Sequence, residues 1–299
     1  MVPTLRNGMP IDPTTAAYLA KVLPLLQISD DKDQLPSVLY HYTDANGLLG
    51  ILQSRKLWAS DVMYLNDSKE IHYGHGLGLA FIQQFREDSM VYRSLRRGLG
   101  YLSSMINEAN VNDYIVSFCA KPDLLSQWRA YGRNGTGFAI GFDRSVLDSV
   151  IAPMDYHNMI ASLFPIVYGE ALQQKLFTEF ATAARSYCGE PTVGVLEWED
   201  LRPWINLVLK CKHPLFREEQ EWRLSVLRLL PGAAPSFRIR QGNIIPYWCI
   251  PLHVDSVVSV HVGPTANPEL STRVVRDLLK YSGHAVAKAI EVSAVPLRA

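Results

Sequence analysis

The hydrophobic pattern of the chain switches repeatedly between the period of a strand and the period of a helix. Short runs rich in β-branched and aromatic residues predict strands, and these are expected at residues 38–43, 56–60, 114–119, 135–142, 165–168, 219–227, 236–240, 247–251, 256–262 and 289–292. Apolar residues spaced three and four apart predict helices, which are expected at 15–26, around 48–52, and at 69–86, 89–110, 127–131, 169–187, 196–211 and 268–281. Short strands with helices clustered between them indicate the α+β class.

The proline-bearing start of the chain, residues 1–36, is predicted to be an N-terminal extension, with Thr14 or Thr15 near the cap of its helix. No internal repeat, low-complexity tract or linker divides the remainder. Residues 37–299 are therefore expected to form a single domain.

The stretch 216–224 combines charge and hydrophobicity in an unusual way. As a strand, it places Glu219, Glu221 and Arg223 on one face. Trp222 and Leu224 fall on the opposite face, which is the pattern of a strand with its back to a core. We expect the acidic face to look into a cleft.

Composition and charge exclude some classes of partner. Lys and Arg number 29 and Asp and Glu number 29, and this balance argues against a broad nucleic-acid or membrane surface. Four cysteines lie far apart and form no CxxC pair, so neither a zinc site nor a disulfide framework is expected. No secretory signal and no apolar run of ~18 residues is visible. We expect a cytoplasmic protein with reduced thiols, although delivery by a specialised secretion system stays open.

Several well-known motifs are missing. The sequence has no GxxxxGK[ST] loop, no HExxH pair and no GxSxG elbow. Gly135, Gly137 and Gly141 approach the dinucleotide fingerprint, but they lie in a predicted strand. His72 and His75 are three residues apart without a visible partner ligand, so no metal site is expected.

Each remaining candidate also has an ordinary structural explanation. His41 ends a predicted strand and is compatible with a satisfied core histidine, and Trp128 suits a core position. Glu219 and Glu221 suit a solvated strand face or ion pairs with nearby Arg and Lys residues. Only a fold that joins His41 to the glutamates makes a common site.

The ordered set of short motifs nevertheless resembles a widespread bacterial family known as a domain of unknown function. The matching pieces span roughly residues 36–265: 39–43 (LYHYT), 57–60 (LWAS), 64–67 (YLND) with Glu70, 117–119 (SFC) with Trp128 and Tyr131, 137–142, Lys212-His213, and Phe216 with 219–223 (EQEWR). That family is in turn distantly similar to ADP-ribosyltransferases. The resemblance implies a split β-sheet core with inserted helices, which holds NAD in the cleft between two sheets.

The same resemblance implies roles for individual residues. Glu221 is expected to be the catalytic acid and Glu219 its assistant, as in relatives with an E-x-E pair, while His41 is expected to hold a ribose hydroxyl. The other expected NAD-binding residues are Tyr42, Thr43, Asn66, Ser117, Trp128, Arg129 and Arg223. The chemistry suits such residues, because carboxylates stabilise the positive charge that develops when a glycosidic bond breaks. Aromatic rings stack on bases, and arginines bind phosphates.

The expected activity is transfer of ADP-ribose from NAD to a macromolecular acceptor, with protein and nucleic acid both open as the acceptor. Bacterial toxins, effectors and phage-defence proteins are the settings that the resemblance implies. NAD hydrolysis is one alternative. A nucleotide- or nucleic-acid-binding module without turnover is another.

Overall fold

The computed structural model describes residues 12–31, 35–64, 69–108, 113–131, 136–151, 159–189, 194–228, 234–240, 242–265, 267–284 and 289–296. The helices are α1 (Pro13–Val22), α2 (Ala45–Ser54), α3 (Lys69–Ile82), α4 (Met90–Glu108), α5 (Leu125–Tyr131), α6 (Arg144–Ile151), α7 (Glu170–Cys188), α8 (Trp198–Leu209) and α9 (Pro268–Tyr281). Short 3₁₀ helices include η1 (Leu23–Gln27) and η4 (Pro214–Glu219).

The strands form one ten-stranded mixed sheet. They are β1 (Val38–Thr43), β2 (Lys56–Asp61), β3 (Asp113–Cys119), β4 (Phe138–Asp143), β5 (Met159–Pro165), β6 (Glu221–Arg228), β7 (Ser236–Arg240), β8 (Asn243–Pro251), β9 (Val257–Val262) and β10 (Ala289–Val292). The order is β10-β9-β4-β1-β3-β2-β8-β7, and β6 and β5 continue from β3. The β9–β10 pair is parallel and the other pairs are antiparallel. The α+β class is thereby confirmed.

The sheet splits at strand β3, and this split positions the site. One edge of β3 pairs with β6 along its whole length, from Asp113 to Cys119. The other edge is shared, because β2 pairs with β3 at Tyr114 and Ile115 and β1 pairs with it at Cys119. Residues 116–118 therefore lie where β1 and β2 diverge from β3.

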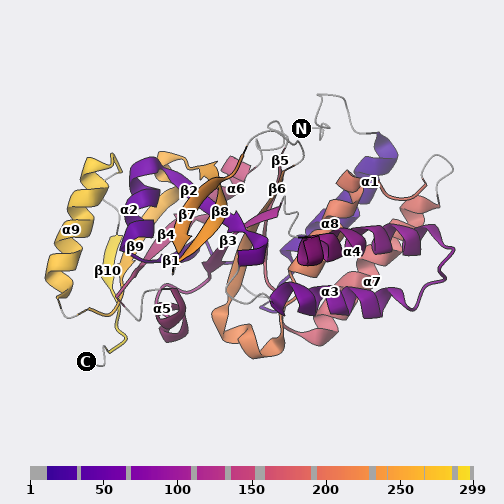
Figure 1. Cartoon of the computed structure of the whole chain (residues 1–299), viewed down its shortest axis with the longest axis horizontal. Helices are drawn as coiled ribbons and strands as arrows, with labels where there is room; N and C mark the ends of the chain where they lie inside the picture. The colour runs from indigo at the N-terminus through magenta and orange to yellow at the C-terminus, as the bar shows by residue number, and fades with distance from the viewer. Residues whose placement is uncertain are drawn as a thin grey trace.

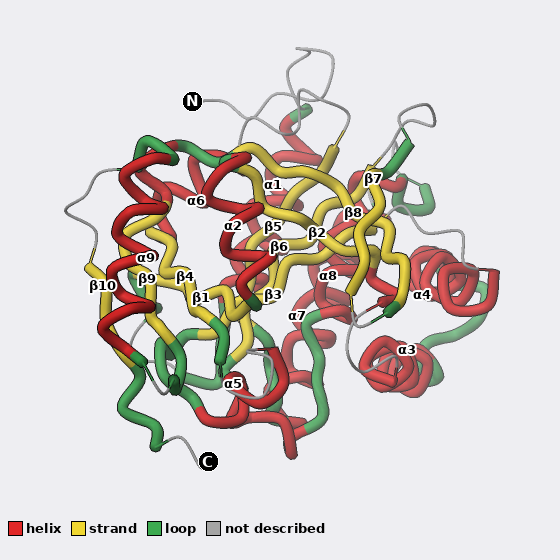
Figure 2. The backbone as a smooth tube through the Cα atoms, turned by 60° about the vertical axis from the view of Figure 1, so that its left-hand side comes forward, coloured by secondary structure: helices red, strands yellow, loops and turns green. Residues whose placement is uncertain are grey.

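The helices divide between the two ends of an elongated molecule (Figure 1). The long helices α3, α4, α7 and α8 gather at one end with α1, and α9 and α2 lie at the other. In Figure 2, α2, α6 and α9 lie on one side of the β1–β4–β9 region and α5 lies on the other. Helices from different parts of the chain thus cover the two sides of the β1–β4–β9 region.

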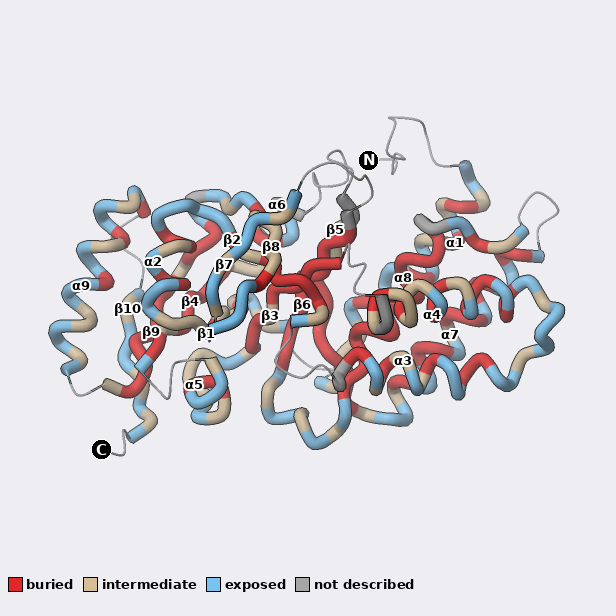
Figure 3. The backbone as a smooth tube through the Cα atoms, viewed as in Figure 1, coloured by how far each residue is buried: buried red, intermediate tan, exposed pale blue. Residues whose placement is uncertain are grey.

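Buried side chains form a helical core and a sheet core (Figure 3). Helix α4 shows why the first forms: Val91, Leu95, Leu99 and Leu102 recur at helical spacing, and all four are buried in it. The sheet core takes alternate side chains of its strands, among them Phe118 of β3 and Trp222 of β6, which are directly paired and share one face of the sheet. Buried strands β5 and β6 lie between the two ends.

The predicted N-terminal extension contributes to the helical core through Tyr18 and Val22. The Asp12 side chain caps α1 by accepting from the backbone N–H groups of Thr14 and Thr15. The expectation that Thr14 or Thr15 lies near this cap is met, but the capping residue itself is Asp12. An aspartate fits this place because it can accept both orphan donors.

Most predicted elements are confirmed, whereas helix α6 was not predicted and two strands differ from the prediction in their bounds. The sequence pattern predicted a strand at 165–168, but the observed strand β5 runs from Met159 to Pro165. Beyond it, Val167 forms only an isolated bridge to Cys211. Leu163 and Phe164 of β5 are both buried, so the strand lacks the alternation that identifies a half-buried strand. The predicted strand 219–227 begins two residues late, because Gln220 adopts the left-handed conformation (φ 43°) after η4.

Candidate functional site

A cavity of about 540 Å³ opens at the split of the sheet. Such a volume is typical of small-molecule and cofactor sites, which span ~300–1,000 Å³. Strands β1, β2, β3, β6 and β7 contribute to its wall together with helix α5 and the end of η4. Of the residues that the sequence suggested, it brings together His41, Tyr42, Thr43, Ser117, Arg129, Glu219 and Glu221.

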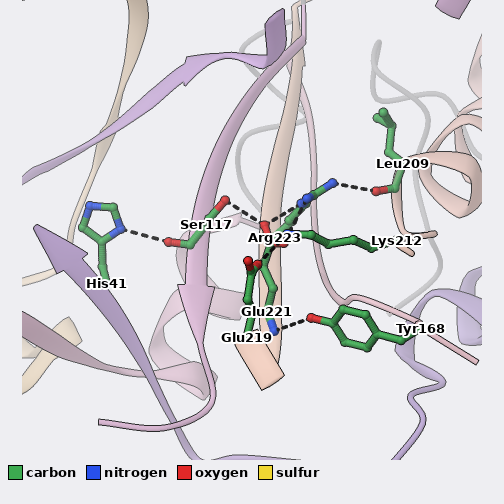
Figure 4. Close-up of polar contacts among 8 residues, drawn as sticks. All are labelled: His41, Ser117, Tyr168, Leu209, Lys212, Glu219, Glu221 and Arg223. Carbon is green, nitrogen blue, oxygen red and sulfur yellow. Dashed lines mark hydrogen bonds and ion pairs between the residues drawn. The ribbon is translucent and has the colours of Figure 1, made fainter. Parts of the chain in front are cut away.

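Glu221 is the most heavily bonded residue of the site (Figure 4). Its Oε1 accepts from Ser117 Oγ at 2.9 Å and from Arg223 Nε at 2.7 Å. Its Oε2 accepts from Lys212 Nζ at 3.0 Å and from Arg223 Nη2 at 2.9 Å. Burial opposes the charge of the carboxylate, but the two cations outweigh it and hold the pKa of Glu221 well below its ordinary value.

Glu219 reaches the same cluster from a different element. It ends the 3₁₀ helix η4, and its Oε2 accepts from Lys212 Nζ at 2.5 Å. Its side chain is 23% exposed, against 8% for Glu221. The two carboxylates are therefore neighbours through Lys212 and not through a shared strand face, which corrects the prediction from the sequence.

The fold builds this turn from local signals. Pro214 begins η4, and the His213 side chain accepts from the N–H of Leu215 to cap it. Gln220 then turns the chain through the left-handed region, which is uncommon for a residue other than glycine. Directly after it, the N–H of Glu221 donates to the Tyr168 hydroxyl at 3.0 Å, which fixes the start of β6.

His41 lies on β1, and Nδ1 of its ring is 2.9 Å from the carbonyl oxygen of Ser117, across the split. A carbonyl can only accept, so Nδ1 carries the proton and Nε2 is left as an acceptor. Burial lowers the pKa of His41 to about 4, and nearby Arg238 and Arg240 add to this effect against the Ser117 bond. His41 is therefore neutral at pH 7.

Arg223 lies behind the cavity, and its place differs from the prediction. Its side chain is 3% exposed, and its Nη1 donates to the carbonyl of Leu209 at 2.9 Å. Its Nε and Nη2 donate to the two carboxylate oxygens of Glu221. It is not part of the cavity wall. Arg223 is therefore placed to orient the carboxylate of Glu221, and it is not placed to contact a phosphate in the cavity.

Trp128 is likewise a core residue. It is fully buried, its Nε1 donates to Asp123 Oδ1 at 2.6 Å, and it does not line the cavity. Its ring meets the edge of Tyr42, whose hydroxyl donates to the Lys121 carbonyl and accepts from the Leu124 N–H. Tyr42 thus borders the cavity, but its hydroxyl is already hydrogen-bonded to the protein. Trp128 is outside the cavity wall, which corrects the prediction that it binds NAD.

The remaining predicted residues divide in two. Thr43 borders the cavity beside Gly47, where an added Cβ would meet Thr43 Oγ1 at 1.8 Å. Arg129 is exposed on α5 and also lines the cavity. Asn66 lies outside the described residues.

Sequence reasoning missed several residues of the wall and its support. Arg238 and Arg240 line the cavity from β7, with Trp58 from β2. Tyr131 of α5, which is among the residues that carry the family resemblance, also lines it. Lys212, buried behind the acids, was considered only as an ion-pair partner. The sequence did contain a signal for the two arginines: residues 236–240 were predicted to be a strand, which places Arg238 and Arg240 on the same face.

Other classes of site were sought in the described part of the chain. No group of three or more His, Cys, Asp or Glu residues there is placed to hold a metal ion. The four cysteines are free thiols. None of the helices in the described ranges combines the length and the apolar character needed to cross a bilayer.

Fold and site together define an α+β protein with a nucleotide-sized cavity that is bordered by a neutral histidine and an acid pair. Residues 127–224 match the model of a family described as "Protein of unknown function (DUF2971)". The matched range holds Lys212, Glu219, Glu221 and Arg223, and it agrees with the resemblance to a family of unknown function. No curated protein and no solved structure matches the chain significantly.

Proposed function

We propose that the chain is an ADP-ribosyltransferase that takes NAD into the split-sheet cavity and transfers ADP-ribose to a macromolecule. The observation that carries the proposal is the meeting of His41 with Glu219 and Glu221 in one cavity of about 540 Å³. These residues lie on β1, η4 and β6, and the split at β3 is what brings them together. A sheet that opens around a ligand is also the core that the resemblance to ADP-ribosyltransferases implies.

The residues present fit the parts of NAD. His41 offers Nε2 as a hydrogen-bond acceptor, which suits a ribose hydroxyl. The exposed side of Tyr131 and the indole of Trp58 supply aromatic surface in the wall. When bound, NAD supplies an activated glycosidic bond, and its cleavage leaves positive charge on the ribose.

The acid pair meets the electrostatic need of that cleavage. Glu221 is held ionised by Arg223 and Lys212, so a fixed negative charge borders the cavity. Glu219 lies nearer to the solvent and is the better placed of the two to orient or deprotonate an acceptor. Ser117 keeps one Glu221 oxygen in place from β3.

One observation favours a second candidate function, a nucleotide-binding module without turnover. Both oxygens of Glu221 already accept two hydrogen bonds each from the protein. A ribose hydroxyl therefore has to displace one of these donors before it contacts this carboxylate. A binding module has no such requirement.

Incubation with NAD that carries a label in its adenylate half tests the proposal. In the presence of a bacterial lysate, we expect release of nicotinamide and transfer of the label to a polymer, and separate protease and nuclease digestions identify that polymer. Nicotinamide release without a labelled polymer indicates NAD hydrolysis. NAD binding by calorimetry with no release of nicotinamide supports the binding module and contradicts the transferase.

A further inference from the structure

Strand β7 presents two arginines to the cavity from the edge of the sheet. Arg238 and Arg240 are two residues apart on β7, so they share one face, and both line the cavity. Phe237, which lies between Ser236 and Arg238 on the same strand, points to the other face and is 63% exposed. Because a strand rises by about 3.3 Å per residue, the backbone positions of the two arginines are roughly 7 Å apart along the strand.

Arg238 is held in place by contacts that leave its charge unneutralised. Its Nη2 donates to Ser60 Oγ at 2.7 Å, and its guanidinium lies 5.4 Å from the Trp58 ring centre and 5.6 Å from that of Tyr247. Its Nε is buried and has no hydrogen-bond partner. Within the described part of the chain, no carboxylate forms an ion pair with this side chain.

Arg240 extends the same positive wall to the other side of the cleft. Its guanidinium lies 5.8 Å from the ring centre of Tyr131, which belongs to α5. Burial lowers the pKa of Arg238 to about 10, and the neighbouring charge of Arg240 adds to this effect, against weaker contributions from Tyr247 and Asp44. The two guanidinium groups thus repel each other, and an anion between them relieves the repulsion.

The two glutamates of the cavity are paired with other cations. Glu219 and Glu221 are engaged by Lys212, and Glu221 also by Arg223, both cations lying outside the cavity wall. Asp44 also borders the cavity, where its carboxylate caps α2 through the Gly47 N–H and contributes only weakly at Arg238. Arg238 and Arg240 therefore place two guanidinium groups of one strand face in the wall of the cavity.

We propose that Arg238 and Arg240 form an anion subsite that binds the diphosphate of a nucleotide ligand. The planar fork of each guanidinium matches a pair of phosphate oxygens, and two forks on one strand face match two linked phosphates better than a single carboxylate. The identity of the complete ligand as NAD rests on the proposed function. The preference for a diphosphate does not, since it depends only on the two arginines.

Calorimetry on the full chain tests the subsite without any need for turnover. The probes are inorganic pyrophosphate, ADP-ribose and nicotinamide riboside, of which the last has no diphosphate. We expect pyrophosphate and ADP-ribose to bind, and Arg238→Gln and Arg240→Gln each to weaken both by at least tenfold. Arg276→Gln, which removes an exposed arginine of α9 away from the cavity wall, is the matched control and is expected to bind as the unmodified chain does.

The possible outcomes separate the subsite from the proposed enzyme. Arg238 also packs against two aromatic rings, so Arg240→Gln alone decides the test if Arg238→Gln fails to fold. Unchanged pyrophosphate affinity in the folded variants, or no pyrophosphate binding by the unmodified chain, overturns the subsite. Arginine-dependent pyrophosphate binding without release of nicotinamide from NAD supports the subsite and contradicts the proposed transferase.

Discussion

The ring of His41 donates from Nδ1 to the backbone carbonyl of Ser117 at 2.9 Å, which links β1 to β3 at the point where their pairing ends. The bond fixes the tautomer of the imidazole and orients it in the cavity wall. Ser117 also donates through its hydroxyl to Glu221. One residue of β3 thus connects the histidine and the acid that the sequence separates most widely.

The lowered pKa of His41 predicts a pH dependence of stability. The folded protein holds this ring neutral down to a pH of about 4, whereas an unfolded histidine takes up a proton near pH 6.5. The contribution of His41 is therefore fully present above about pH 6.5 and is lost as the pH falls from 6.5 towards 4. Urea unfolding between pH 7.5 and 4.5 measures it.

The histidine variant isolates this contribution. His41→Gln is expected to flatten the fall in stability between pH 6.5 and 4.5, because the group that gains a proton on unfolding is gone. His72→Gln, at an exposed position of α3, is the control and is expected to keep the original slope. Equal slopes for both variants contradict the assignment.

Glu219 is the cleaner test of the acid pair. Glu219→Gln removes a partly exposed ion pair with Lys212 and is expected to cost about 1 kcal/mol of stability. Glu221→Gln leaves buried Arg223 without its ion-pair partner and leaves Lys212 with Glu219 alone, which is expected to cost about 3–5 kcal/mol. Thermal and urea unfolding of the two variants measure the difference.

The Glu219→Gln variant also distinguishes a loss of activity from a loss of stability. If Glu219 acts on the acceptor, Glu219→Gln lowers nicotinamide release or label transfer by ~10²-fold or more while the chain stays folded. A folded Glu219→Gln variant with full activity shows that Glu221 acts alone.

Lys212 is expected to keep both acids ionised. Its Nζ lies 3.0 Å from Glu221 Oε2 and also contacts Glu219. Lys212→Met removes one of the two cations that lower the pKa of Glu221, so this pKa is expected to rise and the acidic limb of any activity profile to move to higher pH. Carboxyl NMR titration with ¹³C-labelled glutamate measures the pKa directly, with or without turnover.

The control for Lys212 is a lysine whose ion pair is exposed. Lys175 pairs with Glu179 on α7, and both side chains are well exposed. Lys175→Met is expected to change stability by less than about 1 kcal/mol and to leave the carboxylates of the site unchanged. If Lys212→Met titrates as the unmodified chain does, Lys212 is only a packing residue.

Two aromatic residues are expected to respond differently to substitution. Trp128→Phe removes the hydrogen bond to Asp123 from a fully buried site, so stability falls by about 1–3 kcal/mol while ligand affinity stays unchanged. Tyr131→Ala removes a ring from the cavity wall, so affinity for ADP-ribose falls with little change in stability. The reverse pattern in calorimetry and unfolding contradicts the assignment of Trp128 to the core.

The local pattern of the sequence determined most of the elements, and the family resemblance selected the candidate site residues. Strand β1 with His41, helix α2 and the charged stretch that ends in β6 follow from periodicity, which acts over a few residues. The buried strand β5 was missed because strands covered on both faces lack alternation.

The tertiary structure decided how these residues are used. Glu219 joins Glu221 only because Gln220 turns the chain and Lys212 comes in from the end of α8 to contact both acids. Arg223 and Trp128 are turned into the interior, whereas Arg238 and Arg240 of the edge strand line the cavity. Periodicity records which residues share a face but not what that face meets, because the opposing wall comes from segments that are distant in the chain and meet only when the sheet closes around β3.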